Sequence, residues 1–493
     1  MNFARHGAFF DEFLKERDTS GIYDLACLDI IPRLDIYRDD LITSDLAPTI
    51  RSYPKLNVEA VLLSHAHVDH SGHIALLDAK IPIMASPISI AILKAIRDSS
   101  NTKVSTDIPY MSIREPEFDG IYLSGSAKNY VSRDLACQST MPEALAEFVH
   151  QRPEDPSKKA TKNKATEHKG SMKPGKICCF DELKLSFKVS SFKMDHSIYG
   201  ALAYVLDSEN GSIAYTGDFR IGKRGDTELE KFIEKARDAS TLIIEGTRAG
   251  REGDNTVDEG DVKENCQKTA EEAQGIVVAD YSARNFERMK TFMEIARKTG
   301  RQLVITMKDA YALHAIKCAD GPAFLDDLLV YSEVKGRTNV WERYLNGRET
   351  LSYVTANDVR KNLDGFILSF SFFDMSDLID IRPDAGTYIY SSSEAHSEEQ
   401  AIDFIKLKNW LDRLGLKSAG FDIRAEDGKI RPYFDTGFHT SGHAAKEDII
   451  KVIDNVDPDV IIPVHTEKSQ WFEDQFGGSY VVKRLNIGEK FEL

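Results

Sequence analysis

The sequence predicts an α/β protein of about two or three domains, and three features of the chain lead to this expectation. An apolar stretch over residues 58–63 is typical of a buried strand and runs directly into a polar loop at residues 64–70. Two apolar runs between residues 201 and 216 flank an Asn-Gly pair, which is a strong signal for a β-hairpin. Between residues 259 and 414, helical and strand patterns alternate, as in βαβ units on a parallel sheet.

The composition indicates a folded globular protein of the cytoplasm. Of its 493 residues 42% are hydrophobic and 29% charged, and no apolar run is long enough to cross a bilayer. No secretory signal opens the chain, and the six cysteines form no paired CxxC motif, so we expect reduced thiols. The net charge of -16 argues against a protein that coats nucleic acid with a broad basic surface. It permits a local nucleic-acid site in which the positive charge of metal ions outweighs the negative charge of distant carboxylates.

The loop after the first predicted strand concentrates metal-binding side chains. Three of the chain's 13 histidines and one aspartate lie within six positions, as His65, His67, Asp69 and His70. A loop at a strand end can direct several side chains at one point, and imidazole and carboxylate groups there suit zinc or a similar divalent ion. One ion does not use the whole cluster well, so His65 and His67 are expected to bind one metal, and Asp69 and His70 a second.

The predicted hairpin supplies two more candidate ligands. A strand is expected over residues 183–189, followed by His196, the hairpin and then Asp218. Because a hairpin brings its two ends together, His196 and Asp218 can reach one site although they are distant in the sequence. Each alone would be an ordinary loop residue.

Polar residues also follow the later buried strands. Glu245 ends the predicted strand at residues 241–244, and His465 ends the strand at residues 460–464. His443 precedes the helix that leads to the last of these strands. The histidine at the end of the last strand repeats the layout of the first motif.

Two segments are less regular. Residues 151–176 are rich in Lys, Pro and Gly and almost free of apolar side chains, so we expect a mobile surface loop. This basic loop could touch RNA, although a solvated loop is the simpler interpretation. The strand ends at residues 281–285 and 390–394 lie where α/β sheets usually bind ligands.

Together these motifs resemble the metallo-β-lactamase superfamily, whose ligand signature is His-x-His-x-Asp-His, a distant His, and an Asp after a hairpin. The long α/β insert between Asp218 and His465 resembles that of the β-CASP nucleases in particular. Four further stretches are similar to the archaeal RNase J type: residues 8–14, 283–288, 308–311 and 387–393. The resemblance covers most of the chain.

The resemblance implies an αββα sandwich with an inserted parallel-sheet β-CASP domain. It divides the chain into residues 1–247, 248–436 and 437–493, where the first and last segments form the metallo-β-lactamase domain and the middle one the β-CASP domain. Family members begin with a pair of strands and a Gly-rich turn, and Met1 falls after the point where these would end. Either the start of the chain is misassigned or the first sheet lacks its usual edge strands.

The resemblance also implies a two-metal centre with a shared water. One ion would be bound by His65, His67, His196 and Asp218, and the other by Asp69, His70, Asp218 and His465. Zinc suits the histidines, and manganese is compatible with the same ligands. A hydroxide activated by the two ions would attack a phosphodiester, and His443, oriented by Glu245, would protonate the leaving 3′-oxygen.

Other polar residues could contact the substrate. His439, Ser441, Ser391 and Ser392 could hydrogen-bond a phosphate, although Ser and His near strand ends often cap helices or turns instead. Arg284 and Arg288, expected on a helix, could meet the RNA backbone or be solvated surface.

The resemblance favours an RNA-degrading enzyme that acts as an exonuclease from the 5′ end, with endonuclease cleavage as a second activity. DNA processing is an alternative, but β-CASP nucleases of DNA tend to have Val at the position of His465. The large insert argues against a small-ester hydrolase. The complete set of seven ligand positions argues against a metal-free scaffold subunit. Family members often form homodimers, and the sequence does not test this.

Overall fold

A four-stranded parallel sheet carries the first metal-binding motif. In spatial order its strands are β1 (Val61–Leu62), β2 (Ile83–Ala85), β5 (Leu135–Cys137) and β7 (Ile177–Cys179). The computed structural model describes residues 17–100, 103–154, 172–222, 227–251, 257–394, 398–426, 429–486 and 488–491. Within these residues no strand precedes β1, which forms one edge of the sheet.

A six-stranded mixed sheet packs against the first. In spatial order its strands are β22 (Val481–Val482), β21 (Val460–Val464), β11 (Thr241–Glu245), β10 (Gly211–Tyr215), β9 (Leu202–Ser208) and β8 (Lys188–Lys193). Apolar side chains from both sheets fill the space between them, among them Met84 and Cys178 from one sheet and Leu202 from the other. The Tyr204 hydroxyl donates a hydrogen bond to the Leu63 carbonyl at 2.7 Å and so joins the sheets directly above the metal-binding loop.

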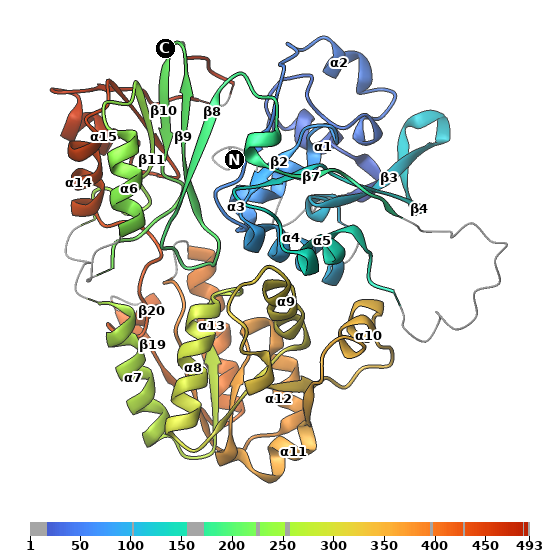
Figure 1. The fold of residues 1–493 in the computed structure, drawn as a ribbon. Coiled ribbons are helices and arrows are strands. Elements are labelled where there is room, and N and C mark those ends of the chain that lie inside the picture. The colour runs from blue at the N-terminus through green and yellow to red at the C-terminus, as the bar shows by residue number, and fades with distance from the viewer. Residues whose placement is uncertain are drawn as a thin grey trace.

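Helices cover the outer faces of the two sheets, so the layers follow the predicted order of helix, sheet, sheet and helix (Figure 1). The six-stranded sheet is covered by α6 (Thr227–Ala236), α14 (Lys446–Val456) and α15 (Ser469–Phe476). The four-stranded sheet is covered by α4 (Pro87–Ser99) and α5 (Glu143–His150). Two short helices, α1 (Tyr23–Cys27) and α2 (Ala47–Arg51), pack into a separate cluster around Leu41.

A seven-stranded, all-parallel sheet forms the lower part of the molecule in Figure 1. In spatial order its strands are β15 (Ser352–Thr355), β14 (Leu329–Ser332), β13 (Gln302–Ile305), β16 (Phe366–Ser369), β12 (Ile276–Asp280), β17 (Gly386–Tyr390) and β18 (Leu416–Ala419). The central strands β12 and β16 are buried along their whole length, as expected of parallel strands covered on both faces.

Each face of this sheet has its own layer of helices. One layer contains α7 (Glu259–Glu272), α8 (Phe286–Lys298), α9 (Met307–Cys318) and α10 (Val340–Asn346). The other contains α11 (Ala356–Lys361), α12 (Met375–Ile381) and α13 (Glu398–Arg413). Side-chain caps fix where several of these helices begin: Asp258 and Asp261 form a capping box at α7, and Thr306 and Asp309 form one at α9. A hairpin of β19 (Phe421–Glu426) and β20 (Lys429–Phe434) leads the chain back towards the metal-binding side.

The two halves of the molecule share a continuous hydrophobic core. Helix α4 of the upper half packs against α9 of the lower half, and residues from both belong to one buried cluster. At this contact the Tyr311 hydroxyl donates to the Asp98 carboxylate at 2.7 Å, and the buried Lys94 pairs with the same carboxylate. Tyr311 belongs to the 308–311 stretch that carried part of the family resemblance, and its side chain joins the two halves.

Three local expectations need correction. The predicted strand at 183–189 begins later, as β8 at Lys188, because the 3-10 turn at residues 180–182 is followed by bends and irregular backbone up to residue 187. A long antiparallel ribbon of β3 (Tyr110–Glu117) and β4 (Tyr122–Ser132) was not expected from the sequence. The predicted loop at residues 151–176 ends in a short strand, β6 (Met172–Lys173), which pairs with β4; residues 155–171 lie outside the described part of the chain. No helix in the described residues is long and apolar enough to span a membrane.

Candidate metal centre and substrate pocket

The ends of neighbouring strands position the seven predicted metal ligands. His65 and His67 lie in the extended loop after β1, and Asp69 and His70 lie in the short helix α3 (Val68–Ser71). His196 follows β8, Asp218 follows β10 and His465 follows β21, all in the adjacent sheet. Two of these strand exits use left-handed backbone, at Gly217 (φ 57°) before Asp218 and at His465 itself (φ 52°). The structure therefore brings all seven residues together.

Among the described residues the candidate ligand atoms form four overlapping groups, and Asp218 belongs to two of them, one with His65 and His70 and one with Glu245, His443 and His465. His65, His67 and His196 offer nitrogen atoms that lie within 4.8 Å of one another, and so do the ligand atoms of Asp69, His70 and His465. The Asp218 carboxylate lies between the two groups, with Oδ2 3.0 Å from His70 Nε2 and 3.7 Å from His65 Nε2. This is the arrangement expected of a carboxylate that bridges two ions.

The first group fits a cation by its chemistry as well as its geometry. His67 Nδ1 lies 3.0 Å from His65 Nε2 and 3.3 Å from His196 Nε2, so three ring nitrogens face one another. Burial, reinforced by the neighbouring imidazoles, lowers the pKa of His67 to about 3 and of His196 to about 4, and it moves the pKa of His65 even further down. These rings are therefore neutral near pH 7, the form that binds a metal ion.

The second group is more open and more strongly charged. The Asp69 side chain is 56% exposed, and its Oδ2 lies 3.0 Å from His465 Nε2. This hydrogen bond raises the pKa of His465 to about 9, and it lowers the pKa of Asp69 even though burial acts in the opposite direction. Without a metal ion the pair holds a proton, which an incoming ion has to displace.

Hydrogen bonds from outside the cluster orient several of the ligands. His196 Nδ1 donates to the Gly442 carbonyl at 2.6 Å, which leaves Nε2 directed at the cluster. The Ser64 hydroxyl lies 3.1 Å from His65 Nδ1. The Thr247 hydroxyl lies 2.7 Å from His465 Nδ1 and 3.2 Å from His443 Nδ1, and it also donates to the His465 carbonyl. Such outer partners fix ring orientation and tautomer. Thr247 was not among the residues predicted for the site, although its place two residues after Glu245 at a strand end was a signal.

Replacing Thr247 with Val is expected to weaken metal binding about 10- to 100-fold, because the His465 ring loses the partner that holds its Nδ1. Competition with a chelating dye measures the affinity directly, without relying on activity. The Thr247→Ser variant keeps the hydroxyl and should bind metal like the unchanged protein. Equal affinities for all three proteins would contradict an orienting role.

His443 and Glu245 form a pair beside the cluster. His443 Nδ1 lies 3.0 Å from Glu245 Oε2, and Glu245 is fully buried. The other Glu245 oxygen accepts hydrogen bonds from the Phe219 and Ala444 amides, which hold the carboxylate in place. Burial lowers the pKa of His443, but the hydrogen bond and charge of Glu245, together with the Asp218 charge, outweigh it and raise the pKa above its usual value. His443 can therefore carry a proton near neutral pH.

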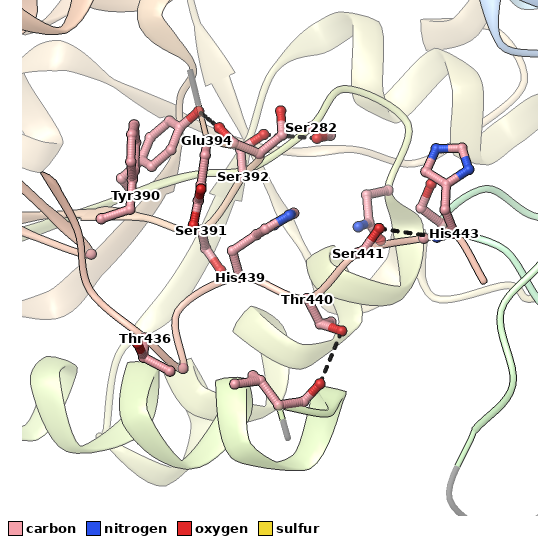
Figure 2. Close-up of a pocket in the computed structure, with 18 of the residues that line it drawn as sticks. Ser282, Tyr390, Ser391, Ser392, Glu394, Thr436, His439, Thr440, Ser441 and His443 are labelled. Atoms are coloured by element: carbon pink, nitrogen blue, oxygen red, sulfur yellow. Dashed lines mark hydrogen bonds between the residues drawn. The ribbon is translucent and has the colours of Figure 1, made fainter. Parts of the chain in front are cut away.

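A pocket of about 380 Å³ opens next to this pair (Figure 2). We call it the serine–histidine pocket; polar residues of its wall include Ser282, Ser392, Ser393, His439, Ser441 and His443, with Arg248 and Arg251. His439, Ser441 and Ser392, three of the four predicted phosphate contacts, line this pocket. Ser391 also borders it but is only 2% exposed, and its hydroxyl donates to the Phe438 carbonyl and accepts from Arg288. Ser391 thus supports the wall of the pocket.

The structure corrects the expectation that Arg284 and Arg288 both lie on a helix and are available to RNA or solvent. Arg284 does not lie on a helix: it has a left-handed backbone (φ 71°) in the turn before α8. Its Nη1 is buried and has no hydrogen-bond partner among the described residues, and its charge interacts with Asp69 and His67. Arg288 lies on α8 but is 1% exposed, so it is neither solvated nor available to RNA.

Arg288 belongs to an ion network that links the metal centre to the lower sheet. Glu259, at the start of α7, accepts from Arg288 at 2.9 Å and from Arg220 at 2.9 Å. Arg220 follows Asp218 closely and also pairs with Asp195, next to His196, at 3.1 Å. Arg288 in turn donates to the Ser391 carbonyl at 2.9 Å. The strand ends that bear two metal ligands are thus connected to the wall of the serine–histidine pocket.

Replacing Glu259 with Ala is expected to destabilise the fold by about 3 kcal/mol, because it leaves the buried Arg288 without its ionic partner. The free energy of unfolding in urea measures the effect. The exposed Glu264 on the same helix provides the control, and its replacement with Ala should change stability by less than about 0.5 kcal/mol. Similar losses in both variants would argue against a specific role for the network.

Comparisons with known proteins are consistent with this site. The family described as the Zn-dependent metallo-hydrolase RNA specificity domain matches residues 431–478. A protein of Mycoplasma genitalium named Ribonuclease J is 24% identical over 316 residues, which are 62% of this chain and 50% of that protein. The Ribonuclease J of Methanocaldococcus jannaschii is 22% identical over 445 residues, or 88% and 80% of the two chains. That of Sinorhizobium meliloti is 22% identical over 479 residues, or 92% and 66%.

The chain thus spans about half the length of the Mycoplasma genitalium relative. Among solved structures, a protein of unknown function from Enterococcus faecalis V583 has a similar fold. Its TM-score is 0.60 at 18% identity, and the match covers 96% of this chain and 90% of that one. The similarity extends over both halves of the molecule and confirms the fold class expected from the sequence.

Proposed function

We propose that this chain, which is similar to Ribonuclease J proteins and to the Zn-dependent metallo-hydrolase RNA specificity domain, is a metal-dependent ribonuclease that hydrolyses RNA phosphodiester bonds. The convergence of six further candidate metal ligands around Asp218, beside the His443–Glu245 pair and the serine–histidine pocket, carries this proposal. We further propose that it acts 5′ to 3′ as an exonuclease in RNA decay or processing, with endonuclease cleavage as a second mode.

Two divalent ions would fit the residues present. His65, His67, His196 and Asp218 would hold one, and Asp69, His70, Asp218 and His465 the other, with zinc as the preferred metal and manganese as an alternative. When bound, the ions would supply Lewis-acid polarisation of the phosphoryl group and lower the pKa of a water molecule.

The protein groups around the ions have separate tasks in this proposal. Glu245 accepts the Nδ1 proton of His443, so Nε2 of the protonated ring is the atom that can donate to the leaving 3′-oxygen. The products are then a 5′-phosphate and a 3′-hydroxyl. Asp69 orients His465 as well as offering a ligand atom.

Substrate phosphates need cationic or hydrogen-bonding partners, and the pocket supplies both. Arg284 has a buried Nη1 without a described partner close to Asp69 and His67, and we assign it to a phosphate at the reacting bond. His439, Ser441 and Ser392 are assigned to a phosphate in the serine–histidine pocket. These local groups allow an RNA substrate despite the net charge of -16.

The proposal also includes the wider organisation of the protein. Residues 1–247 and 437–493 would form the metallo-β-lactamase domain, and residues 248–436 the β-CASP domain. A homodimer is part of the proposal on the family resemblance alone. A cytoplasmic location is supported by the six cysteines, all of which are free thiols.

A cleavage assay with added zinc or manganese tests the function. The substrates are RNAs labelled at the 5′ or 3′ end and bearing a 5′-monophosphate or 5′-triphosphate, together with matched DNA. Release of mononucleotides from monophosphorylated RNA supports the 5′ exonuclease, and internal fragments move the assignment to an endonuclease. Cleavage of DNA alone, or of no nucleic acid by the metal-loaded protein, overturns the proposal.

A further inference from the structure

A second cavity lies at the carboxyl ends of the central strands of the seven-stranded sheet. It has a volume of about 320 Å³ and is bordered by the residues at or just after the ends of β12, β16 and β17, including Asp280, Phe372 and Tyr390. β12 lies between β16 and β17, so the chain crosses over β12 on its way from β16 to β17. Open α/β sheets bind ligands at such points, and this volume lies within the usual range of about 300–1,000 Å³ for ligand sites.

The lining of this cavity is aromatic and acidic. We call it the phenylalanine pocket, after Phe372, Phe373 and Phe404. Phe373 is 89% exposed at its rim, and its ring lies edge to face with Phe372 at 5.8 Å. Asp280, Glu394 and Asp403 supply carboxyl groups, and no Lys, Arg or His is found among the described residues of the lining. Such a surface suits a flat, uncharged ring and disfavours a phosphate.

The phenylalanine pocket is continuous with the serine–histidine pocket. Ser282, Tyr390 and Ser392 line both cavities, and the Ser282 and Ser392 hydroxyls are hydrogen-bonded to each other at 2.7 Å across the shared wall. Figure 2 shows these two serines and Tyr390 at one end of the serine–histidine pocket, with His443 at the other. Glu394 also lines both cavities, but cationic side chains are found on one side only: Arg248, Arg251 and two histidines line the serine–histidine pocket, whereas the described lining of the phenylalanine pocket has none.

We propose that the phenylalanine pocket binds a nucleobase of the RNA while a phosphate of the same nucleotide occupies the serine–histidine pocket. This inference rests on the proposed function and adds to it a site for the base. The exposed Phe373 ring is placed to stack on the base at the rim of the cavity. Because every base has a π face, stacking of this kind accepts any of the four bases and contributes affinity without reading the sequence.

Binding of small nucleotides to the full chain tests the inference without requiring hydrolysis. Titration calorimetry compares adenosine 5′-monophosphate, uridine 5′-monophosphate and ribose 5-phosphate, which share the phosphate and differ in the base. Both nucleotides should bind at least about 5-fold more tightly than ribose 5-phosphate. The Phe373→Ala variant should lose about 5- to 150-fold in affinity for the nucleotides and retain its affinity for ribose 5-phosphate. Because Phe373 is 89% exposed, this substitution should leave the fold intact.

The matched control is Phe118→Ala. Phe118 is 74% exposed in the turn between β3 and β4, in the upper half of the molecule away from the seven-stranded sheet (Figure 1), so its loss should change the affinity of none of the three compounds. Equal affinities for the nucleotides and ribose 5-phosphate, or unchanged nucleotide binding in Phe373→Ala, would overturn the base site. If base-dependent binding is absent but the unchanged protein cleaves RNA, the base site is wrong and the proposed ribonuclease function stands. If base-dependent binding is present but the protein cleaves no RNA, the proposed ribonuclease function is wrong.

Discussion

Replacement of Asp218 with Asn is expected to remove bound metal and to lower kcat/KM on RNA by about 10³-fold or more. The Asp218 carboxylate lies close to His65 and His196 of one histidine group and to His70 of the other, and it is 2% exposed. Hydrogen bonding and the charge of His70 hold the pKa of Asp218 well below its usual value against the effect of burial, so the carboxylate is ionised at neutral pH. Asn keeps the shape but loses the charge that two ions need between them.

Metal content by mass spectrometry and initial cleavage rates measure the effect of Asp218→Asn. Asp207→Asn is the matched control, because Asp207 lies in the same β9–β10 hairpin, near its turn, where it pairs with the surface residue Lys235. The control should keep both metal and activity. Retention of two ions and of near-normal rates in Asp218→Asn would contradict the bridging role.

His443→Ala is expected to lower kcat/KM by about 10²- to 10⁴-fold while the metal content stays unchanged. His443 is hydrogen-bonded to Glu245 and lies close to Asp218 and His465, but it is not one of the seven proposed metal ligands, so its loss should remove a proton donor and leave those ligands in place. Parallel measurements of metal content and of the rate on RNA separate the two roles. A loss of metal in His443→Ala would show that the ring acts through the ions instead.

The pH dependence gives an independent test of the same residue. A proton donor works only while protonated, and the raised pKa of His443 extends its protonated range above the ordinary value of 6.5. Activity should therefore fall as the pH rises through this raised pKa. In Glu245→Gln the hydrogen-bonded negative charge is gone, so the alkaline limb of kcat/KM should move to lower pH. An alkaline limb at the same pH in both proteins would contradict the assignment.

The local sequence determined much of the candidate metal centre. His65, His67, Asp69 and His70 are close together in the chain, and a single strand end is enough to bring them to one place. The hairpin signal was equally local, and it correctly joined His196 to Asp218. Strand periodicity likewise predicted β11, β12, β16 and β21 to within about two residues, because buried parallel strands are continuous apolar runs.

Only the tertiary structure decided the roles of residues whose partners lie far away in the sequence. Arg288 and Arg284 have the same side chain and are four positions apart, yet Arg288 is neutralised by Glu259 and buried, whereas Arg284 has a buried Nη1 without a described partner near Asp69. Ser391 and Ser392 are adjacent, but side chains alternate in direction at a strand end. The Ser391 hydroxyl is therefore hydrogen-bonded within the wall of the serine–histidine pocket, whereas Ser392 faces the pocket itself. The sequence alone thus determined which residue types meet at the strand ends, since that depends on local periodicity. Some of these residues already have a charged or hydrogen-bonding partner from a distant part of the chain. Packing between segments decides which residues these are, and the periodicity of the sequence does not encode that packing.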